Sequence, residues 1–288
     1  MLAYRRCLRA GVILSAIATG AVGTAAPAHA QTRLEARYTV TLAGIPLGSG
    51  TWVIDIAADQ YTAVASGRTS GLVKLISDGS GTTGTRGVIR GAQIASLGYI
   101  SSVISDKRND EVRMALAGGV VKEVVVDPPV PPSPDRIPVT DAHRKGVTDP
   151  MSAVLVTVAG TGEVVSPDAC KRKLAVFDGR QRADIELVFK RMDRVKADKG
   201  YQGPVVVCTV IYNPIAGHRP ERAAIKYLTA TREMEMWLAP IEGTRMLVPF
   251  RFSVPTPFGL GLLQATYFVA GPRAAQTARE TPLTAKAQ

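Results

Sequence analysis

After residue 31, hydrophobic and polar residues alternate along the chain with the period of a β-strand. In the first such stretch the apolar positions are Leu34, Ala36, Tyr38, Val40 and Leu42, and the polar positions between them are Glu35, Arg37, Thr39 and Thr41. This pattern predicts a strand with one buried and one solvated face. A turn is expected at Gly44–Gly48, followed by a second strand around Trp52–Ile56 and a third at Tyr61–Thr69, which together indicate an antiparallel meander.

The same kind of pattern continues over most of the chain. Further strands are expected at Thr82–Ile89, Gln93–Ser105, Glu111–Leu116, Val120–Val126, Leu174–Phe177, Ala183–Arg194, Val205–Tyr212, Ala224–Thr231, Glu233–Leu238, Leu247–Val254 and Leu260–Phe268. The short apolar stretch Gly71–Ile76 is interpreted as a helical turn or loop at one end of the sheet. Many short strands separated by turn signals predict a mainly β fold, either an antiparallel, strongly curved sheet or a half-open barrel.

One segment has helical periodicity instead. Asp149 and Pro150 supply an N-cap and a proline at the first helical position. The apolar residues that follow, spaced at i, i+3, i+4 and i+7, are Met151, Val154, Leu155 and Val158. Because this spacing gives a helix one apolar stripe, we predict a short helix over Met151–Val158 that covers one face or mouth of the sheet.

The chain is predicted to consist of two halves of one fold. An N-terminal antiparallel β half spans residues 31–127, and the predicted helix and a C-terminal β half span residues 148–272. Between them, residues 128–147 form a linker whose first part is rich in proline, a residue that cannot donate to a β-ladder and favours extended geometry. Residues 273–288 are small and polar, and we expect a disordered tail.

The first thirty residues have the three-part pattern of a secretory signal peptide. Arg5, Arg6 and Arg9 lie in a segment without acidic residues, an apolar stretch follows, and Ala28-His29-Ala30 provides a small-residue cleavage site. Cleavage is therefore expected after Ala30, with a periplasmic location. No later stretch is long and apolar enough for a transmembrane helix.

Cleavage at this site changes the charge of the chain only modestly. Residues 1–30 contain three arginines and no acidic residue, so their removal lowers the formal charge from +11 to +8. An excess of basic residues often indicates nucleic-acid binding, but export argues against that partner. The polyanions of a cell envelope are lipid phosphates and wall polymers, although a solvated basic surface without a partner also explains such a charge.

Two cysteines, Cys170 and Cys208, remain in the mature chain. In an oxidising compartment the simplest expectation is that they form a disulfide. A metal site is the alternative, but His143 and His218 do not lie at ligand spacing from either cysteine. We therefore predict neither a metal nor a cofactor.

The stretch after Cys170 combines a hairpin signal with a group of basic residues. Asp178-Gly179 lies between two alternating runs and favours a tight type I′ turn, because both central residues of that turn need positive φ. A Cys170–Cys208 bond would tie this hairpin to the next strand. The basic residues around the hairpin are Lys171, Arg172, Lys173, Arg180 and Arg182.

Three stretches resemble the exported bacterial domain-of-unknown-function family 3108. They are Tyr38–Gly48, the region of Cys170 and Phe177–Arg182 with Cys208–Gly217, and Trp237–Leu238 with Leu247–Phe252. The resemblance covers nearly the whole mature chain. It implies an envelope location and a mostly β fold, and it implies no catalytic residues because the family has no established activity.

No catalytic constellation stands out in the sequence. Gly79–Gly84 spells a G-x-G-x-x-G pattern, but the residues after it favour a strand rather than the helix that a dinucleotide site needs. Nucleophile-elbow motifs are absent. His218 is expected in a polar surface turn, and no spacing identifies a serine partner for either histidine. The sequence thus leans against an enzyme without deciding the question.

The leading hypothesis is a non-catalytic protein that binds an envelope amphiphile, such as a lipid or a lipid-linked glycan. The inner face of the curved sheet would take the apolar part, with a fully packed core as the alternative. The predicted ligand-binding residues are Lys171, Arg172, Lys173, Arg180, Arg182 and Trp237, and the basic ones would hold a phosphate by charge-assisted hydrogen bonds. A structural or protein-interaction module of the envelope is the second hypothesis, and an envelope hydrolase is the weakest.

Overall fold

The computed structural model describes residues 32–70, 78–106 and 108–272. The predictions for the signal peptide, for Gly71–Ile76 and for the tail 273–288 lie outside these residues. Within them, the strands of the N-terminal half are β1 (Thr32–Leu42), β2 (Ile45–Ile56), β3 (Gln60–Thr69), β4 (Gly79–Arg90), β5 (Gln93–Ser105), β6 (Arg108–Ala117) and β7 (Val120–Asp127).

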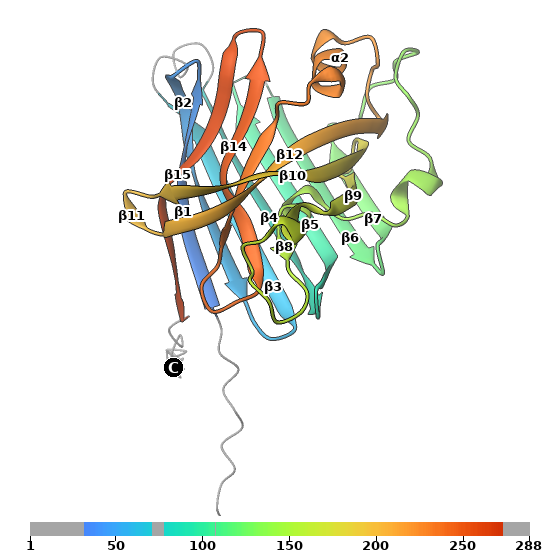
Figure 1. Ribbon diagram of the computed structural model, residues 1–288. Coiled ribbons are helices and arrows are strands. Elements are labelled where there is room, and N and C mark those ends of the chain that lie inside the picture. The colour runs from blue at the N-terminus through green and yellow to red at the C-terminus, as the bar shows by residue number, and fades with distance from the viewer. Residues whose placement is uncertain (1–31, 71–77, 107, 273–288) are drawn as a thin grey trace, which may run out of the picture.

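The C-terminal half adds more strands and two α-helices (Figure 1). The strands are β8 (Val156–Thr157), β9 (Arg172–Phe177), β10 (Arg182–Lys196), β11 (Lys199–Gly200), β12 (Gln202–Ala216), β13 (Glu235–Pro240), β14 (Met246–Thr256) and β15 (Gly259–Pro272). The helices are α1 (Pro150–Ala153) and α2 (Ala223–Ala230), and short 3-10 helices occur at η2 (Asp141–Arg144) and η3 (Pro167–Cys170).

The strands form one large, strongly curved sheet, as the sequence predicts. Its order is β7-β6-β5-β4-β3-β2-β1-β15-β14-β13-β12-β10-β9, and β1 pairs with β15 along its whole length to join the two halves. All these neighbours are antiparallel, and the short β11 adds a parallel pairing with β15. Among the described residues no ladder joins β7 to β9, so the sheet is not closed into a barrel.

Side chains and one connecting segment bring the two sheet edges together. Phe177 of β9 is buried in a cluster with Val112 and Met114 of β6. Between the edges runs the segment before α1, where Val147 donates its N–H to the carbonyl of Gly119 and Thr148 forms a parallel bridge with Val176. The result is a barrel-like shape with one side closed by packing rather than by strand pairing.

Buried and solvent-accessible positions alternate along β1 as the sequence predicts. Leu34, Ala36 and Tyr38 are buried, and they pack in the main core with residues of β2 and β14. The turn after β1 is shorter than predicted, however. It occupies Ala43 and Gly44, both with positive φ, and β2 starts at Ile45. The rest of the stretch predicted as a turn, including Pro46, lies inside β2. The glycine and proline residues there therefore do not interrupt the strand.

The predicted helix over Met151–Val158 is wrong beyond its first turn. Asp149 caps α1 as expected, since its carboxylate accepts the N–H groups of Met151 and Ser152. The helix ends at Ala153, and Val156–Thr157 pairs instead with β14 as β8. The apolar spacing also fits a buried extended segment, and a run rich in β-branched residues favours that state.

The strand predicted at Ala224–Thr231 is also wrong, because this segment is α2. Alanine, leucine and lysine favour a helix, and the segment lies against β12 beside the sheet rather than within it. The apolar residues there are spaced too irregularly to separate helix from strand.

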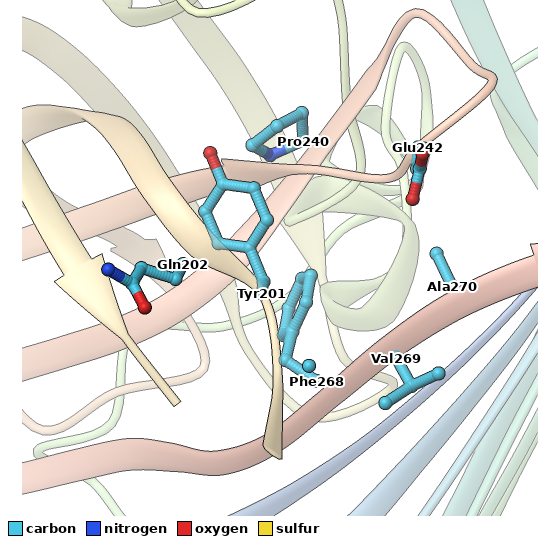
Figure 2. A pocket seen from close by; sticks show the side chains of 8 residues that line it. Tyr201, Gln202, Pro240, Glu242, Phe268, Val269 and Ala270 are labelled. Carbon is cyan, nitrogen blue, oxygen red and sulfur yellow. The ribbon is translucent and has the colours of Figure 1, made fainter. Parts of the chain in front are cut away.

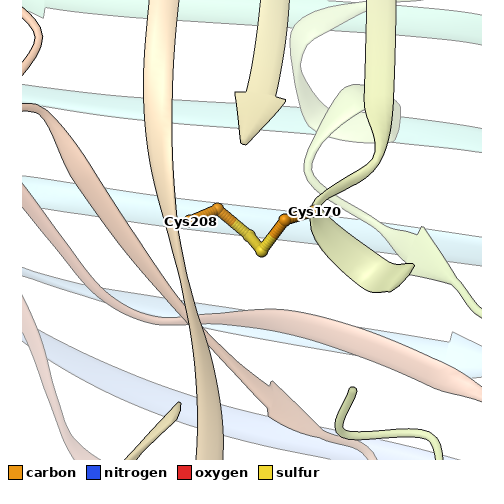
Figure 3. Close-up of a disulfide and its surroundings, with 2 residues drawn as sticks. All are labelled: Cys170 and Cys208. Atoms are coloured by element: carbon orange, nitrogen blue, oxygen red, sulfur yellow. A yellow bond between two sulfur atoms is a disulfide. The ribbon is translucent and has the colours of Figure 1, made fainter. Parts of the chain in front are cut away.

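The disulfide prediction is confirmed, as Figure 3 shows: Cys170 at the end of η3 is bonded to Cys208 of β12. Because β10 lies between β9 and β12 in the sheet, the bond ties the chain before β9 to a strand two positions away. The turn between β9 and β10 is not of the predicted two-residue type. It is a four-residue loop in which the Asp178 carboxylate accepts the N–H groups of Arg180 and Gln181, and only Gly179 has positive φ.

The proline-rich linker is docked onto the sheet rather than free. Ile137 exchanges two backbone hydrogen bonds with the Gly217-His218 segment after β12. Arg136 donates to the carbonyl of Gly217, and Arg219 pairs with Asp135. The linker therefore forms part of the closed side of the molecule.

Candidate ligand-binding cavity

A cavity of about 920 Å³ lies inside the curve of the sheet. One end of the interior, around the start of β1 and the end of β2, is filled by core side chains such as Leu34, Ile54 and Tyr61. At the other end the core gives way to this open volume. Its size is within the range of about 300–1,000 Å³ that is typical of small-molecule sites.

Aliphatic and aromatic side chains form the wall that the C-terminal half contributes. They come from β9, β10, β12, β13 and β14 and are Leu174, Val176, Ile185, Leu187, Val210, Met236 and Phe252. Tyr38 and Trp52, from β1 and β2, extend the same apolar surface. Such a wall offers dispersion contacts and almost no hydrogen-bonding groups, so it suits hydrocarbon.

The opposite wall is formed by small residues of β2–β5, and this explains why the cavity exists. Gly50, Gly67 and Gly81 lie directly opposite one another on three neighbouring strands. They face inward with the buried positions of their strands, such as Trp52 on β2 and Ala63 on β3. Because a glycine has no side chain, the wall recedes along this row and leaves space where a larger residue would fill the core.

Helix α1 forms the floor of the cavity and is fixed by a buried polar network. Asp149 is fully buried, and its carboxylate accepts hydrogen bonds from the hydroxyls of Thr85 and Ser152 in addition to the two N–H groups of α1. The hydroxyls of Ser152 and Tyr61 are 2.6 Å apart, and burial raises the pKa of Tyr61 to about 12. These groups satisfy one another, so the network positions α1 rather than presenting a reactive group.

Few polar side chains of β2–β5 point into the cavity. Because side chains alternate along a strand, the lining hydroxyls on the same face as Gly67 and Gly81 are those of Thr69, Thr83, Ser101 and Ser105. The other polar residues of the lining alternate with them, so their side chains lie on the outer face of the sheet: Ser49, Thr51, Ser66, Arg68, Ser80 and Thr82. The cavity is therefore apolar in its depth, with a few hydroxyls near its open end, which is an arrangement suited to an amphiphile.

The structure places the residues predicted to bind a ligand around the cavity rather than in its lining. Three of the cations have carboxylate partners: Lys171 pairs with Asp168, Arg180 with Asp110 of β6, and Arg182 with Asp184. Lys173 lies opposite Glu186 on the outer face of the β9–β10 pair. These four side chains are thus engaged with acidic neighbours or directed away from the cavity.

Arg172 differs from the other cations. Side chains alternate along a strand, so Arg172 shares the inner face of β9 with Leu174 and Val176, which line the cavity. Its Nε atom is buried without a hydrogen-bond partner, and no ion pair joins it to any part of the chain that the structure describes. Burial lowers the pKa of its guanidinium.

Trp237 is not in the cavity lining but in the main core cluster, together with Val205 and Val207 of β12. Its indole N–H donates to Asp193, and the guanidinium groups of Arg191 and Arg251 lie 5.3 and 5.1 Å from its ring centre. Its hydrogen-bonding group is therefore already paired. Its neighbour Met236 faces the cavity instead.

His143 and His218 do not lie in a candidate catalytic or metal-binding site among the residues that the structure describes. His143 lies in η2 and accepts the N–H of Thr140. His218, expected in a surface turn, is buried against the docked linker, and burial lowers its pKa. Within residues 32–70, 78–106 and 108–272, no cluster of three or more histidine, cysteine, aspartate or glutamate residues could hold a metal.

Figure 2 shows a second, smaller hollow of about 380 Å³. It is formed where the end of the β10–β12 hairpin meets β15, and Tyr201, Glu242 and Phe268 contribute to it. The Tyr201 hydroxyl donates to the carbonyl of Pro204, and its ring packs against Phe250 and Phe268. This hollow belongs to the packing that holds the hairpin to the sheet.

Comparison of the sequence with family models gives a match over most of the chain. The model of a family described as "Protein of unknown function (DUF3108)" matches residues 37–265. The chain belongs to this family. DUF3108 proteins carry no assigned activity in that description, and a search of curated proteins finds no match.

Solved structures similar to this DUF3108 protein include a beta-barrel-like protein of the domain of unknown function DUF1849 from Brucella abortus, at 11% identity and a TM-score of 0.45. The match covers 85% of this chain and 99% of the other. Among the described residues of the present chain, no helix is both long and apolar enough to cross a bilayer.

Proposed function

We propose that this protein binds a lipid-like amphiphile non-covalently, with the hydrocarbon part in the cavity. The observation that carries the proposal is the volume of about 920 Å³ between an aliphatic wall and a wall of small residues. Interiors of proteins are normally packed to a density close to that of organic crystals. A large apolar volume beside a packed core is therefore best explained by a ligand that fills it.

We also infer that the protein works outside the cytoplasm, in the periplasm. The pattern of residues 1–30 supports this inference, as does the Cys170–Cys208 bond, since disulfides persist in oxidising compartments. Lipids and lipid-linked glycans are amphiphiles available there. If the signal peptide is cleaved as expected, mass spectrometry of the exported protein should give the mass of a chain that begins at Gln31.

The proposal predicts that filling the cavity abolishes binding without unfolding the protein. At Gly67 a Cβ atom would have only the carbonyl oxygen of Ser49 within 4 Å, at 3.5 Å, so Gly67→Leu can place its side chain in the cavity. We expect the affinity for a fluorescent fatty acid to fall about tenfold or more, which is roughly 1.4 kcal/mol. Native mass spectrometry of the protein purified without detergent should show a bound lipid-sized species in the wild type only.

The matched control is Thr62→Leu, which adds the same side chain to the exposed outer face of the same strand. It should bind the probe as the wild type does. A wild-type protein that carries no amphiphile and binds no fatty acid would overturn the proposal, as would equal binding by the wild type and Gly67→Leu.

A further inference from the structure

We propose that two hairpin tips beside the open end of the cavity form a membrane-docking rim, which places the cavity against a lipid bilayer. The rim consists of Ala43–Ile45, where β1 turns into β2, and Pro257–Leu260, where β14 turns into β15. This inference rests on the proposed function, since the bilayer is the source of the amphiphile that the cavity would take.

The rim carries large apolar side chains that water surrounds. Phe258 is 81% exposed, Ile45 55% and Leu260 48%. A single exposed apolar side chain needs no explanation, but these three are gathered on two adjacent tips. The carbonyl of Leu260 accepts the N–H of Ala43, and Leu42 lies opposite Gly261, so the two tips form one continuous surface.

The rim projects beyond the cavity at its open end. The outermost lining residues on these strands are Val40 of β1 and Leu263 of β15. From the Phe252–Leu263 pair, β14 and β15 continue to the Thr256–Gly259 pair, which adds about 13 Å at roughly 3.3 Å per residue. Figure 1 shows this hairpin and the β1–β2 tip reaching past the sheet at the same end of the molecule.

A bilayer fits this surface better than a protein partner does. A stable protein interface buries about 800 Å² on each side, and a few side chains on two narrow tips present much less. Protruding phenylalanine, leucine and isoleucine side chains are instead suited to insertion between lipid headgroups. The charges nearby are mixed, with Arg68 at the cavity margin and Asp78 and Asp106 on the neighbouring strands' ends. Apolar insertion, rather than charge, would therefore supply most of the attraction.

The proposal is tested by flotation of the mature protein with phosphatidylcholine vesicles. We expect the wild type to float with the vesicles, with little dependence on salt concentration. The double variant Phe258→Asp/Leu260→Asp should bind at least tenfold less. The turn between β14 and β15 is held by Thr256, whose hydroxyl donates to the carbonyl of Gly259, so these substitutions leave its hydrogen bonds in place.

The matched control is Val125→Asp on β7, a residue that is 60% exposed on an edge strand of the sheet, away from the four strands that carry the rim. It should float as the wild type does. Absence of wild-type flotation, or equal flotation of the wild type and the double variant, would overturn the docking rim. Equal losses in the double variant and in Val125→Asp would also overturn it, since charge and not position would then be responsible.

Fatty-acid binding in solution without vesicles separates this inference from the proposed function. A double variant that binds the probe normally but no longer floats supports the rim while the cavity remains intact. A wild type that binds the probe but does not float overturns the rim alone. A wild type that floats but takes up no probe, and carries no lipid, supports the rim as a bilayer contact and removes the proposed function of the cavity.

Discussion

At the scale of single residues, the cavity depends on glycines, which have no side chain, as much as on the apolar side chains of its other wall. Gly50, Gly67 and Gly81 produce the recessed wall only because the strand register aligns them. Each glycine is visible in the sequence as an interruption of an alternating pattern, but its alignment with the other two is not. This is why the sequence supported both a packed core and a cavity.

Arg172 is the residue for which the structure sharpens the sequence prediction most. The sequence could not rank the five cations around the β9–β10 hairpin, since acidic partners such as Asp110 and Asp168 come from spatial proximity. With those pairs known, Arg172 is the desolvated cation next to the aliphatic wall and without an ion pair in the described chain. It is thus the best candidate among them for contact with an anionic headgroup.

We predict that Arg172→Met lowers the affinity for a fatty acid about tenfold or more, because a hydrogen bond to a charged group contributes roughly 1.5–3 kcal/mol. The affinity for the alcohol of the same chain length should not change. Fluorescence titration with both ligands measures the difference. Lys171→Met serves as the control, because Lys171 is exposed and paired with Asp168. Equal losses for acid and alcohol would mean that Arg172 acts through packing.

At the scale of elements, the sequence predicted strands well and helices badly. In strands with one solvent-exposed face, such as β1 and β3, apolar and polar residues alternate, and this alternation can be recognised in the sequence. Segment Val154–Val158 and helix α2 were misassigned because each is short, and short apolar segments have too few residues to define a period. The contacts that decide them are distant in sequence, as in the pairing of Val156 with Leu247.

The network around Asp149 leads to a prediction for helix α1. Asp149→Ala removes the acceptor of two hydroxyls and two N–H groups in a fully buried site. We expect the free energy of unfolding to fall by about 2–4 kcal/mol, from loss of the N-cap and of buried hydrogen bonds. Because α1 is the floor of the cavity, fatty-acid affinity should fall as well.

Urea denaturation of this variant and of Asp141→Ala measures the effect. Asp141 begins the short helix η2, but its side chain is exposed, so that substitution should cost well under 1 kcal/mol. Similar stabilities of the two variants would contradict the structural role of the network.

At the scale of the whole molecule, the two halves predicted from sequence are joined at two places. One is the long β1–β15 ladder. The other is the contact between the sheet edges, where Phe177 packs against β6 and Arg180 reaches Asp110, 3.0 Å away. The first kind of contact extends the sheet, while the second bends it back on itself and encloses the cavity. We therefore expect the halves to unfold as one cooperative unit.

The two tryptophans make this expectation testable, because Trp52 lies in the N-terminal half and Trp237 in the C-terminal half. With Trp237→Phe and Trp52→Phe as single-tryptophan backgrounds, the two urea transitions followed by fluorescence should coincide. Phe177→Ala should lower the urea midpoints of both transitions together. The free energy of unfolding should fall by about 3–5 kcal/mol, since Phe177 is almost fully buried. Val188→Ala, at an exposed position of β10, is the control and should leave both nearly unchanged. Two separate transitions would instead mean that each half folds alone, and that the cavity exists only while the edge contact holds.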